Sequence, residues 1–324
     1  MARRLVDYVI DNRFTRPARA ALERRAFAWP PIRAWVNGRH NRTNAEGRIA
    51  LYHRSAKIFR GHDGRFKTGV WDIDVPPFRL RMPLRPEQAW LDWDTALSAL
   101  GHDAEIKDFY ASILTSDLRP DLFCDIGANY GVHTFLMRSA GVPALAFEPN
   151  PACAEYFHRL EQLNGFDDVR REPIALGDFT GTARLTFPET ETWLGTIHMA
   201  DDLVPPEVSG ATIETPVKRL DDLAIEAERC LVKIDAEGSE LRVIRGGRRF
   251  LADCSAFVVF ESNRAEDRAE LFDEFTRLGF SIEGLPMPDI QRSQSLARDA
   301  FLAAPGVNFV ARNLASGRRG KVKA

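Results

Sequence analysis

The sequence predicts an α/β fold built on a Rossmann-like, mostly parallel sheet. Short apolar runs alternate with amphipathic segments from residue 121 to residue 278, the order that builds parallel sheets. A turn of mostly small residues, Asp125-Ile-Gly-Ala-Asn-Tyr-Gly131, joins the first apolar run to the segment after it. With 324 residues, 44% of them hydrophobic, the chain can bury one large core and a small additional part.

The first third of the chain has a different pattern. Residues 1 to 28 place apolar side chains at helical spacing, with Pro17 as an interruption. Two strand-like runs at 70 to 75 and 78 to 82, joined through a Pro-Pro pair, predict a β-hairpin. Residues 90 to 114 then favour a helix.

The core elements follow in alternation. An excursion between residues 181 and 223 contains two further strand-like runs, 183 to 187 and 212 to 217, where an insertion would shape a substrate pocket. Residues 279 to 282 and 306 to 311 predict the last two strands. We expect strands near 121 to 126, 144 to 148, 169 to 175, 230 to 235 and 256 to 261, and helices near 131 to 140, 152 to 164, 239 to 251 and 265 to 278.

The turn at 125 to 131 has the form of a cofactor cradle. A buried strand ends at Asp125, and the following helix points its free N–H groups at the turn. The interval from Gly127 to Glu148 matches the spacing that places a carboxylate on a ribose hydroxyl pair. Asn129 stands where a dinucleotide motif has its second glycine, and the Asp125 carboxylate would repel a pyrophosphate. S-adenosylmethionine (SAM), which has an adenosine, no phosphate and a cationic end, fits better, although a tight turn without any ligand is the alternative.

At these residues the chain resembles the FkbM-type SAM-dependent methyltransferases. The resemblance covers roughly residues 95 to 312 and implies SAM as cofactor, with a seven-stranded sheet and helices on both faces. Together with the charge and residue patterns, it leads us to divide the chain into a basic leader (1 to 60, partly helical or disordered), a hairpin and helix annex (61 to 115), the methyltransferase domain (116 to 312) and a basic tail (313 to 324). It rests on Asp125-Ile-Gly-Ala-Asn-Tyr-Gly131, Phe147-Glu-Pro-Asn150, Val217-Lys-Arg-Leu-Asp-Asp-Leu223, Lys233-Ile-Asp-Ala-Glu-Gly-Ser-Glu240, Gly246 and Val258-Val-Phe-Glu261.

The expected cofactor contacts lie in two of these segments, 125 to 131 and 147 to 150, and in a further one, 175 to 178. The segment from Ala175 to Asp178 resembles the family's segment after the third strand, which makes both residues candidates for contact in the adenine region. Glycines 127, 131 and 195 are interpreted as positions of close backbone approach. The cofactor candidates are Asp125, Gly127, Asn129, Gly131, Glu148, Pro149, Asn150, Ala175 and Asp178.

The acceptor side is expected after the fourth core strand. Alternation puts Lys233 and Asp235 on one side of that strand, so Asp235 could act as base or hydrogen-bond acceptor while Lys233 polarises a hydroxyl; a structural ion pair is the alternative. Glu237 is a candidate for substrate contact, whereas a favourable interaction with the helix N-terminus would also explain Glu237 and Glu240. Asp235, Glu237 and Glu261 could instead hold Mg²⁺ through oxygen ligands.

Three further residues are candidates. Glu261 ends the fifth core strand and could contact substrate or be structural. His133 opens the helix after the cofactor turn, where it could contact substrate or be a partly buried helix-start histidine. His198, in the excursion, is the reserve general base.

The leading function is a SAM-dependent O-methyltransferase acting on a hydroxyl of a glycan, glycolipid or secondary metabolite, and the acceptor class comes from the resemblance alone. A nucleic-acid methyltransferase is the first rival, against which stands Asp235-Ala-Glu-Gly238 in place of an Asn/Asp-Pro-Pro-aromatic run. A nicotinamide-dependent sugar oxidoreductase and a non-catalytic adaptor are the others.

Charge is distributed unevenly. Residues 1 to 60 hold 14 Lys and Arg against 4 Asp and Glu, whereas the rest holds 30 against 42. A basic segment ahead of an acidic body suggests an anionic partner such as a membrane surface, unless it docks on its own acidic body. The sequence has neither an apolar run long enough to span a bilayer nor a secretory h-region, so we expect a cytoplasmic protein, with peripheral attachment to a membrane as the alternative. Four scattered cysteines indicate neither a disulfide framework nor a zinc site.

Overall fold

The computed structural model describes residues 25–59, 69–85, 89–188, 196–198, 210–262, 267–287, 290 and 294–313. The predicted N-terminal helices fall almost wholly outside these ranges, as do Gly195 and nearly all of the basic tail. The chain divides into two units, Met1–Ala104 and Glu105–Ala324, which we call the N-terminal and C-terminal units.

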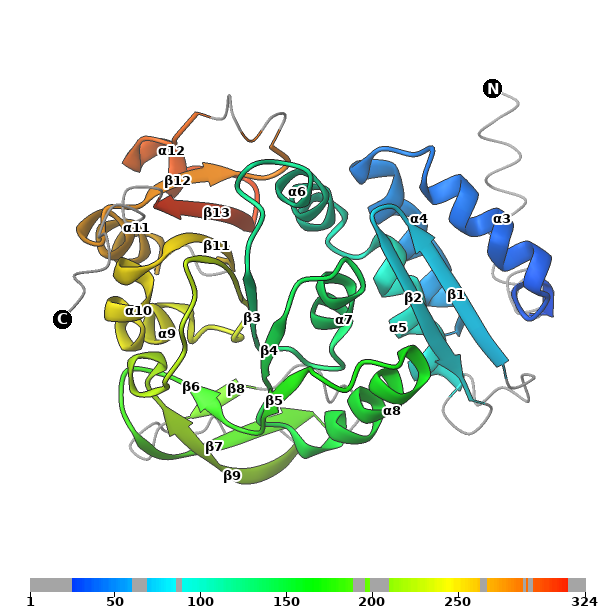
Figure 1. The fold of residues 1–324 in the computed structure, drawn as a ribbon, viewed down its shortest axis with the longest axis horizontal. Coiled ribbons are helices and arrows are strands. Elements are labelled where there is room, and N and C mark those ends of the chain that lie inside the picture. The colour runs from blue at the N-terminus through cyan, green and yellow to red at the C-terminus, as the bar shows by residue number, and fades with distance from the viewer. Residues whose placement is uncertain are drawn as a thin grey trace. The chain divides into compact units, whose positions relative to one another are not determined.

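The N-terminal unit contains the predicted hairpin (Figure 1). Its two strands pair antiparallel, with Val75 opposite Phe78, and alternate residues of each strand are buried. The indoles of Trp71 and Trp93 meet in its core, with ring centroids 5.6 Å apart. The elements are α3 (Pro30–His40), α4 (Ala45–Phe59), β1 (Gly69–Val75), β2 (Phe78–Leu84) and α5 (Ala89–Gly101).

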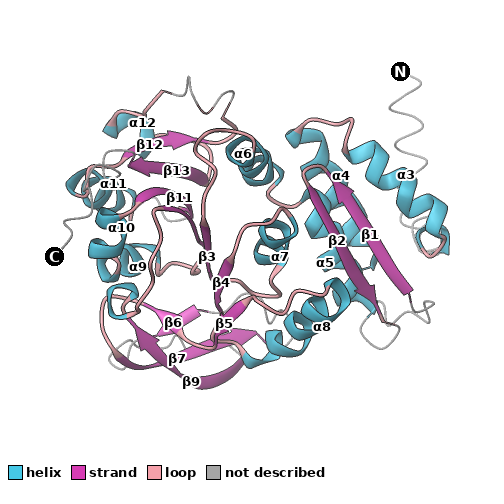
Figure 2. Cartoon of the chain, in the orientation of Figure 1, coloured by secondary structure: helices cyan, strands magenta, loops and turns pink. Residues whose placement is uncertain are grey.

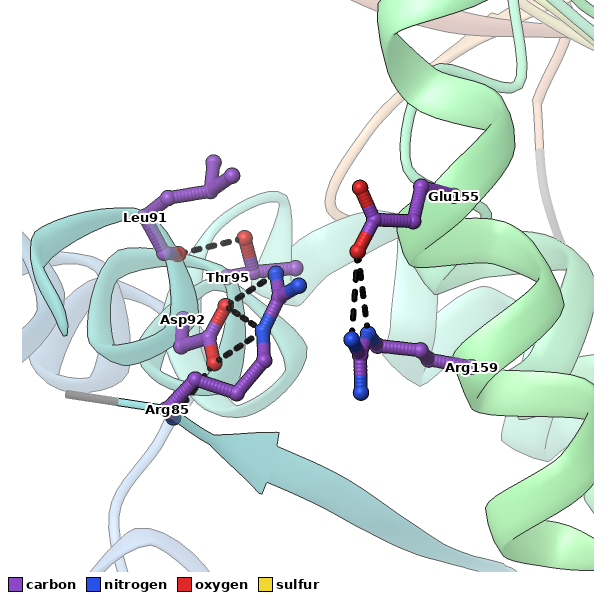
Figure 3. A network of polar contacts seen from close by, with 6 residues as sticks. All are labelled: Arg85, Leu91, Asp92, Thr95, Glu155 and Arg159. Atoms are coloured by element: carbon purple, nitrogen blue, oxygen red, sulfur yellow. Dashed lines mark hydrogen bonds and ion pairs between the residues drawn. The ribbon is translucent and has the colours of Figure 1, made fainter. Parts of the chain in front are cut away.

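A buried ion pair ties the end of the hairpin to α5. The Arg85 guanidinium donates through Nε and Nη2 to the carboxylate of Asp92, and the Arg85 backbone N–H donates to Asp92 Oδ2 at 2.6 Å (Figure 3). Asp92 is fully buried. Removing either partner would leave the other charge buried without compensation, which is strongly destabilising. We therefore interpret this pair as structural.

The predicted helix over residues 90 to 114 is two helices. The first, α5, ends at Gly101, and α6 (Ala104–Leu114) begins after a short break. Asp103 in this break has a φ of 48°, a left-handed conformation that no helix interior contains. The sequence pattern missed the break because apolar residues continue at helical spacing on both sides of it.

The C-terminal unit is built on a seven-stranded sheet, as predicted. Every pair in it is parallel except those made by β13, which runs antiparallel to both of its neighbours. In order across the sheet the strands are β12 (Ser281–Gly284), β13 (Asn308–Asn313), β11 (Ser255–Glu261), β10 (Arg229–Ile234), β3 (Leu122–Ile126), β4 (Ala144–Phe147) and β5 (Arg170–Glu172).

Helices cover both faces of this sheet (Figure 1). On one face Tyr110 of α6 packs edge-on against Phe123 of β3, and on the other Val243 and Phe275 join the core formed by alternate strand residues such as Cys124. One face carries α6, α7 (Val132–Ser139) and α8 (Ala154–Asn164, preceded by the 3₁₀ turn Pro151–Cys153); the other carries α9 (Glu240–Gly246), α10 (Arg248–Asp253) and α11 (Arg268–Arg277), and α12 (Arg298–Leu302) precedes β13.

Two core predictions need correction. The strand expected over 169 to 175 is split: β5 ends at Glu172 and belongs to the large sheet, whereas β6 (Ala175–Leu176) joins a second sheet. The helix expected over 239 to 251 is broken at Gly247 into α9 and α10. A Cβ on Gly246 would lie 1.9 Å from the carbonyl oxygen of Gly177, so α9 packs directly against the chain that leaves β6.

The excursion adds three strands to β6 to make a second, four-stranded sheet. It contains the two strands expected there, in the order β6, β9 (Gly210–Lys218), β7 (Gly181–Pro188) and β8 (Thr196–His198). A 3₁₀ turn, Leu220–Asp222, returns the chain to β10. Among the helices that the structure describes, none combines the length and apolar character needed to cross a bilayer.

Candidate active site

The predicted cofactor and acceptor residues lie on neighbouring strand ends. In the sheet β3 lies between β10 and β4, so the loops that follow these three strands leave from the same edge, where α/β folds bind ligands (loops are pink in Figure 2). Asp125 is in register with both Lys233 and Ala146. The backbone N–H of Asp235 donates to the carbonyl of Ile126 at 3.0 Å, which extends the pairing beyond the last strand residues.

The turn after β3 depends on three residues with positive φ. The φ angles are 76° at Gly127, 51° at Asn129 and 82° at Gly131. Asparagine tolerates this region better than most residues, which explains how the turn forms with Asn129 in the second glycine position.

The two glycines are explained by contacts within the protein. A Cβ on Gly127 would lie 1.8 Å from the carbonyl oxygen of Asp235, and one on Gly131 would lie within 3 Å of the rings of Phe157 and Phe135. Both were interpreted as positions of close backbone approach. The structure identifies the approaching groups as the loop after β10 and the aromatic core.

Asp125 is a buried carboxylate with one oxygen in use. Its Oδ2 accepts a hydrogen bond of 2.6 Å from the hydroxyl of Thr134, in the first turn of α7. Its Oδ1 is buried and receives no hydrogen bond from the described residues. Burying an unsatisfied charged oxygen is costly, and a bound cation would remove that cost. Motif spacing does not predict a role for Thr134, which lies between His133 and Phe135; the signal that could have found it is a hydroxyl in the first turn of the helix after the predicted cofactor turn.

Glu148 organises the loops after β3 and β4. Its Oε2 accepts the backbone N–H of Asn129 at 2.8 Å, and its Oε1 accepts that of Asn150 at 2.7 Å. Burial raises the pKa of the Glu148 carboxyl, opposed by these two N–H groups and by the charge of Arg171. A carboxylate has about four acceptor positions, and these two N–H groups occupy only part of them. The remaining positions could accept the two ribose hydroxyls, as predicted for Glu148.

The neighbours of Glu148 complete this part of the site. Asn150 is buried, and its Oδ1 accepts the backbone N–H of Ala152, which caps the following 3₁₀ turn. Pro149, between them, is half-buried. The thiol of Cys153 donates to Asn129 Oδ1 at 3.6 Å. Side chains and backbone therefore hold this loop in a single arrangement.

The acceptor-side pair is present as an ion pair. Lys233 Nζ lies 2.9 Å from Asp235 Oδ2, with the lysine side chain 5% exposed and the aspartate side chain 33% exposed. The buried ammonium therefore orients a carboxylate that solvent or a substrate can reach.

Glu237 combines a raised pKa with a sharp turn of the backbone. It has a φ of 49°, followed by 96° at Gly238, so the chain turns sharply here. Burial, then the charges of Asp235 and Glu240, raises the pKa of Glu237 to about 7, although Lys233 acts against this shift. Catalytic acids and bases are frequently half-buried carboxyls on a strained backbone, with a pKa near neutrality.

Glu240 has a different role from Glu237. Its Oε1 accepts the backbone N–H groups of Ala236 at 2.9 Å and Gly238 at 3.1 Å, and burial raises the pKa of its carboxyl. These bonds hold the loop before α9. They explain why a glutamate is buried here, and no ligand is needed for that explanation.

The three remaining candidates lie on three different elements, α7, β11 and β8. His133 is largely buried in α7, edge-on to Tyr110 with ring centroids 5.7 Å apart. Glu261 is the last residue of β11, half-buried and in register with Asn308. His198 ends β8, but its side chain lies outside the described part of the chain.

The two candidates for the adenine region belong to the small sheet. Ala175 is buried in β6 against Ala183 and Val217, whereas Asp178 is exposed after it. Ala175 thus has a packing role of its own. Within the described ranges, no group of three or more His, Cys, Asp or Glu side chains is placed to hold a metal ion.

Comparison with known proteins identifies a domain. Residues 125–282 match the family model described as the methyltransferase FkbM domain. Over 140 residues the chain is 28% identical to Methyltransferase 1 of Beauveria bassiana, covering 38% of this chain and 56% of that protein.

Solved structures give weaker similarities. A methyltransferase FkbM from Methylobacillus flagellatus aligns with a TM-score of 0.39 and 14% identity over 68% of this chain and 54% of its own. A precorrin-6y C5,15-methyltransferase from Geobacter metallireducens aligns with a TM-score of 0.36 and 13% identity over 65% of this chain and 90% of its own.

The chain spans little more than half the length of the fungal relative and of the Methylobacillus protein. The family match, in contrast, begins at Asp125 and ends at Ile282, within the seven-stranded sheet, and it includes both the cofactor turn and the acceptor-side loop. Through residues 125–282, the chain contains a methyltransferase FkbM domain.

Proposed function

We propose that this protein transfers the methyl group of SAM to a hydroxyl oxygen of a glycan, glycolipid or secondary metabolite. The observation that carries the proposal is the buried Oδ1 of Asp125, which receives no hydrogen bond from the described residues at the end of β3. The ammonium of the methionine end of SAM is a cation of the right kind for this oxygen.

The other cofactor residues support the same ligand. Glu148 keeps acceptor positions for the two ribose hydroxyls after bonding the N–H groups of Asn129 and Asn150. Bound SAM would supply an electrophilic methyl group on a sulfonium, for which the protein has only to hold the acceptor in line. The match to the FkbM domain supports methyl transfer over the nicotinamide-dependent alternative.

A hydroxyl acceptor must lose its proton at or before attack. In our proposal Asp235, oriented by Lys233, accepts a hydrogen bond from the acceptor, and Glu237 removes the proton. Its pKa of about 7 leaves a large ionised fraction at neutral pH while keeping a strong affinity for a proton. The acceptor class is taken from the family resemblance.

The test uses SAM tritiated in its methyl group. The full-length protein is incubated with it and with separate pools of glycans, glycolipids, small metabolites and nucleic acid, and label in each pool is counted. Mild alkali then separates the products, because methyl esters release labelled methanol whereas methyl ethers keep the label. Alkali-stable label in a hydroxyl-rich pool, lost in Glu237→Gln, is the expected result. Label only in nucleic acid, or only as ester, would overturn the proposal.

A further inference from the structure

We propose that helix α3 of the N-terminal unit binds anionic lipid bilayers through one face. We define this α3 outer face as the exposed residues Pro31, Ala34, Trp35, Arg39 and Arg42, together with Trp29, the exposed residue that immediately precedes the helix. Trp29 is 62% exposed and Trp35 is 56% exposed; among the described residues, Val307 is the one other large hydrophobic side chain with high exposure. Isolated exposed side chains are ordinary, but two tryptophans beside one short helix are not.

The spacing along α3 groups apolar and basic side chains. Pro31, Trp35 and Arg39 are four residues apart and therefore lie along one side of the helix. The Arg39 guanidinium lies over the Trp35 ring, 5.7 Å from its centroid. Arg42, just beyond the helix end, is also exposed.

The opposite side of α3 is fixed to the hairpin. Asn37 Nδ2 donates to the carbonyl of Asp72 at 2.7 Å, and its Oδ1 accepts from the Trp71 indole at 3.2 Å. Arg33 Nη2 donates to the carbonyl of Val70, and Asn41 Nδ2 to that of Asp74. These bonds use the polar groups of the inner side and leave the outer face turned away from the hairpin.

The charge of this region selects an anionic partner. Residues 25–59 contain 7 Lys and Arg and a single acidic residue, Glu46. Tryptophan beside arginine is typical of surfaces that lie at the bilayer interface, where the indole sits at headgroup level and arginine meets lipid phosphate. Single-stranded nucleic acid usually stacks on aromatic rings within a basic groove, whereas Trp29 and Trp35 are more than half exposed. The bilayer is therefore the partner that fits.

The experiment is sedimentation of the full-length protein with phosphatidylcholine vesicles, with and without phosphatidylserine. We expect binding only to vesicles with phosphatidylserine, and weaker binding as salt is raised. The double variant Arg39→Gln, Arg42→Gln should lose about thirtyfold in vesicle affinity, because each arginine near an anionic leaflet contributes a factor of about five. The double variant Trp29→Ser, Trp35→Ser should lose the blue shift of tryptophan fluorescence that vesicles cause.

The matched control is Arg79→Gln, Arg81→Gln on β2. It removes the same charge from the same unit, at arginines that face Asp74 and Asp72 at 3.4 Å. Its vesicle affinity should stay within about threefold of the original. Equal losses in this control and in the α3 arginine variant would overturn the proposal, as would the absence of vesicle binding. Binding of a single-stranded oligonucleotide instead of vesicles, with loss in the α3 variants, would assign the face to nucleic acid.

Discussion

The loops after β3 and β4 and the loop after β10 share one edge of the sheet but differ in how their polar groups are satisfied. On the proposed cofactor side, Glu148 accepts two backbone N–H groups and Asp125 accepts the hydroxyl of Thr134, so groups of the protein hold both carboxylates. On the acceptor side, Glu237 is half-buried beside two other carboxylates and has a raised pKa. In our proposal, the first half positions the cofactor and the second transfers the proton of the acceptor.

Substitution of Gly127 should have the largest effect, because a side chain there would push the loop after β3 and the loop after β10 apart. A Cβ would lie 1.8 Å from the Asp235 carbonyl oxygen, so Gly127→Ala must displace the loop after β10 from the loop after β3. We expect a loss of about 3 kcal/mol or more in stability to urea, combining a left-handed alanine with a backbone clash. Calorimetric titration with S-adenosylhomocysteine should show no binding.

Gly165 is the matched control for that variant. It has a φ of 67° at the end of α8, and a Cβ there would meet nothing within 4 Å. Gly165→Ala should therefore cost only the backbone strain, about 1 to 2 kcal/mol, and leave affinity for S-adenosylhomocysteine unchanged. Similar behaviour of the two variants would mean that contact between the loops contributes little.

The titration of Glu237 should be visible in stability. Because its pKa is raised to about 7 in the folded protein, the folded state binds an extra proton between the ordinary pKa and 7. Protonation of Glu237 therefore contributes to the free energy of unfolding. This contribution is complete below the ordinary pKa of a glutamate and is lost as pH rises through about 7. In urea unfolding, Glu237→Gln should match the original protein at low pH and exceed it at pH 8 by about 1 to 2 kcal/mol, after allowance for solvent screening.

Glu155→Gln is the control for this pH dependence. Glu155 is exposed on α8, where it accepts two hydrogen bonds of 3.2 Å from Arg159 (Figure 3). Its removal should change stability by no more than about 0.5 kcal/mol at either pH. If Glu237→Gln shows no greater pH dependence than this control, Glu237 is an ordinary surface carboxyl and not the base.

The smallest effect is expected at Asn129, whose contribution to the turn comes chiefly from its backbone. Its N–H reaches Glu148 in a left-handed conformation that glycine adopts without strain. Asn129→Gly should change affinity for S-adenosylhomocysteine by less than about 0.5 kcal/mol, whereas Asn129→Val should weaken binding strongly because a β-branched residue is strained there. A large loss in the glycine variant would assign a direct ligand contact to the side chain.

Much of the fold could be predicted because local patterns determine it. Apolar runs located the strands of the sheet, and a mostly parallel sheet of seven strands followed from the family resemblance. The split between β5 and β6 and the break at Gly247 could not be predicted, since each depends on packing between distant segments such as Gly246 against Gly177.

The site was less accessible to prediction than the fold. Motif spacing pointed to Asp125, Glu148 and Asp235, which do lie on neighbouring strand ends. The raised pKa of Glu237 depends on how deeply a left-handed turn buries it, and local sequence carries little information on that depth. The reason for each glycine likewise required knowing which group lies against it.

We propose that Asp125 binds the cationic end of SAM, and this contact can be measured by calorimetric titration with S-adenosylhomocysteine. Asp125→Asn keeps an oxygen for Thr134 but removes the charge, so we predict saturable binding to the original protein and a loss of about 1 to 3 kcal/mol in the variant. Asp168→Asn, at an exposed pair with Arg138, should bind like the original protein. Equal affinity in Asp125→Asn and the original protein, or no binding to either, would contradict the account.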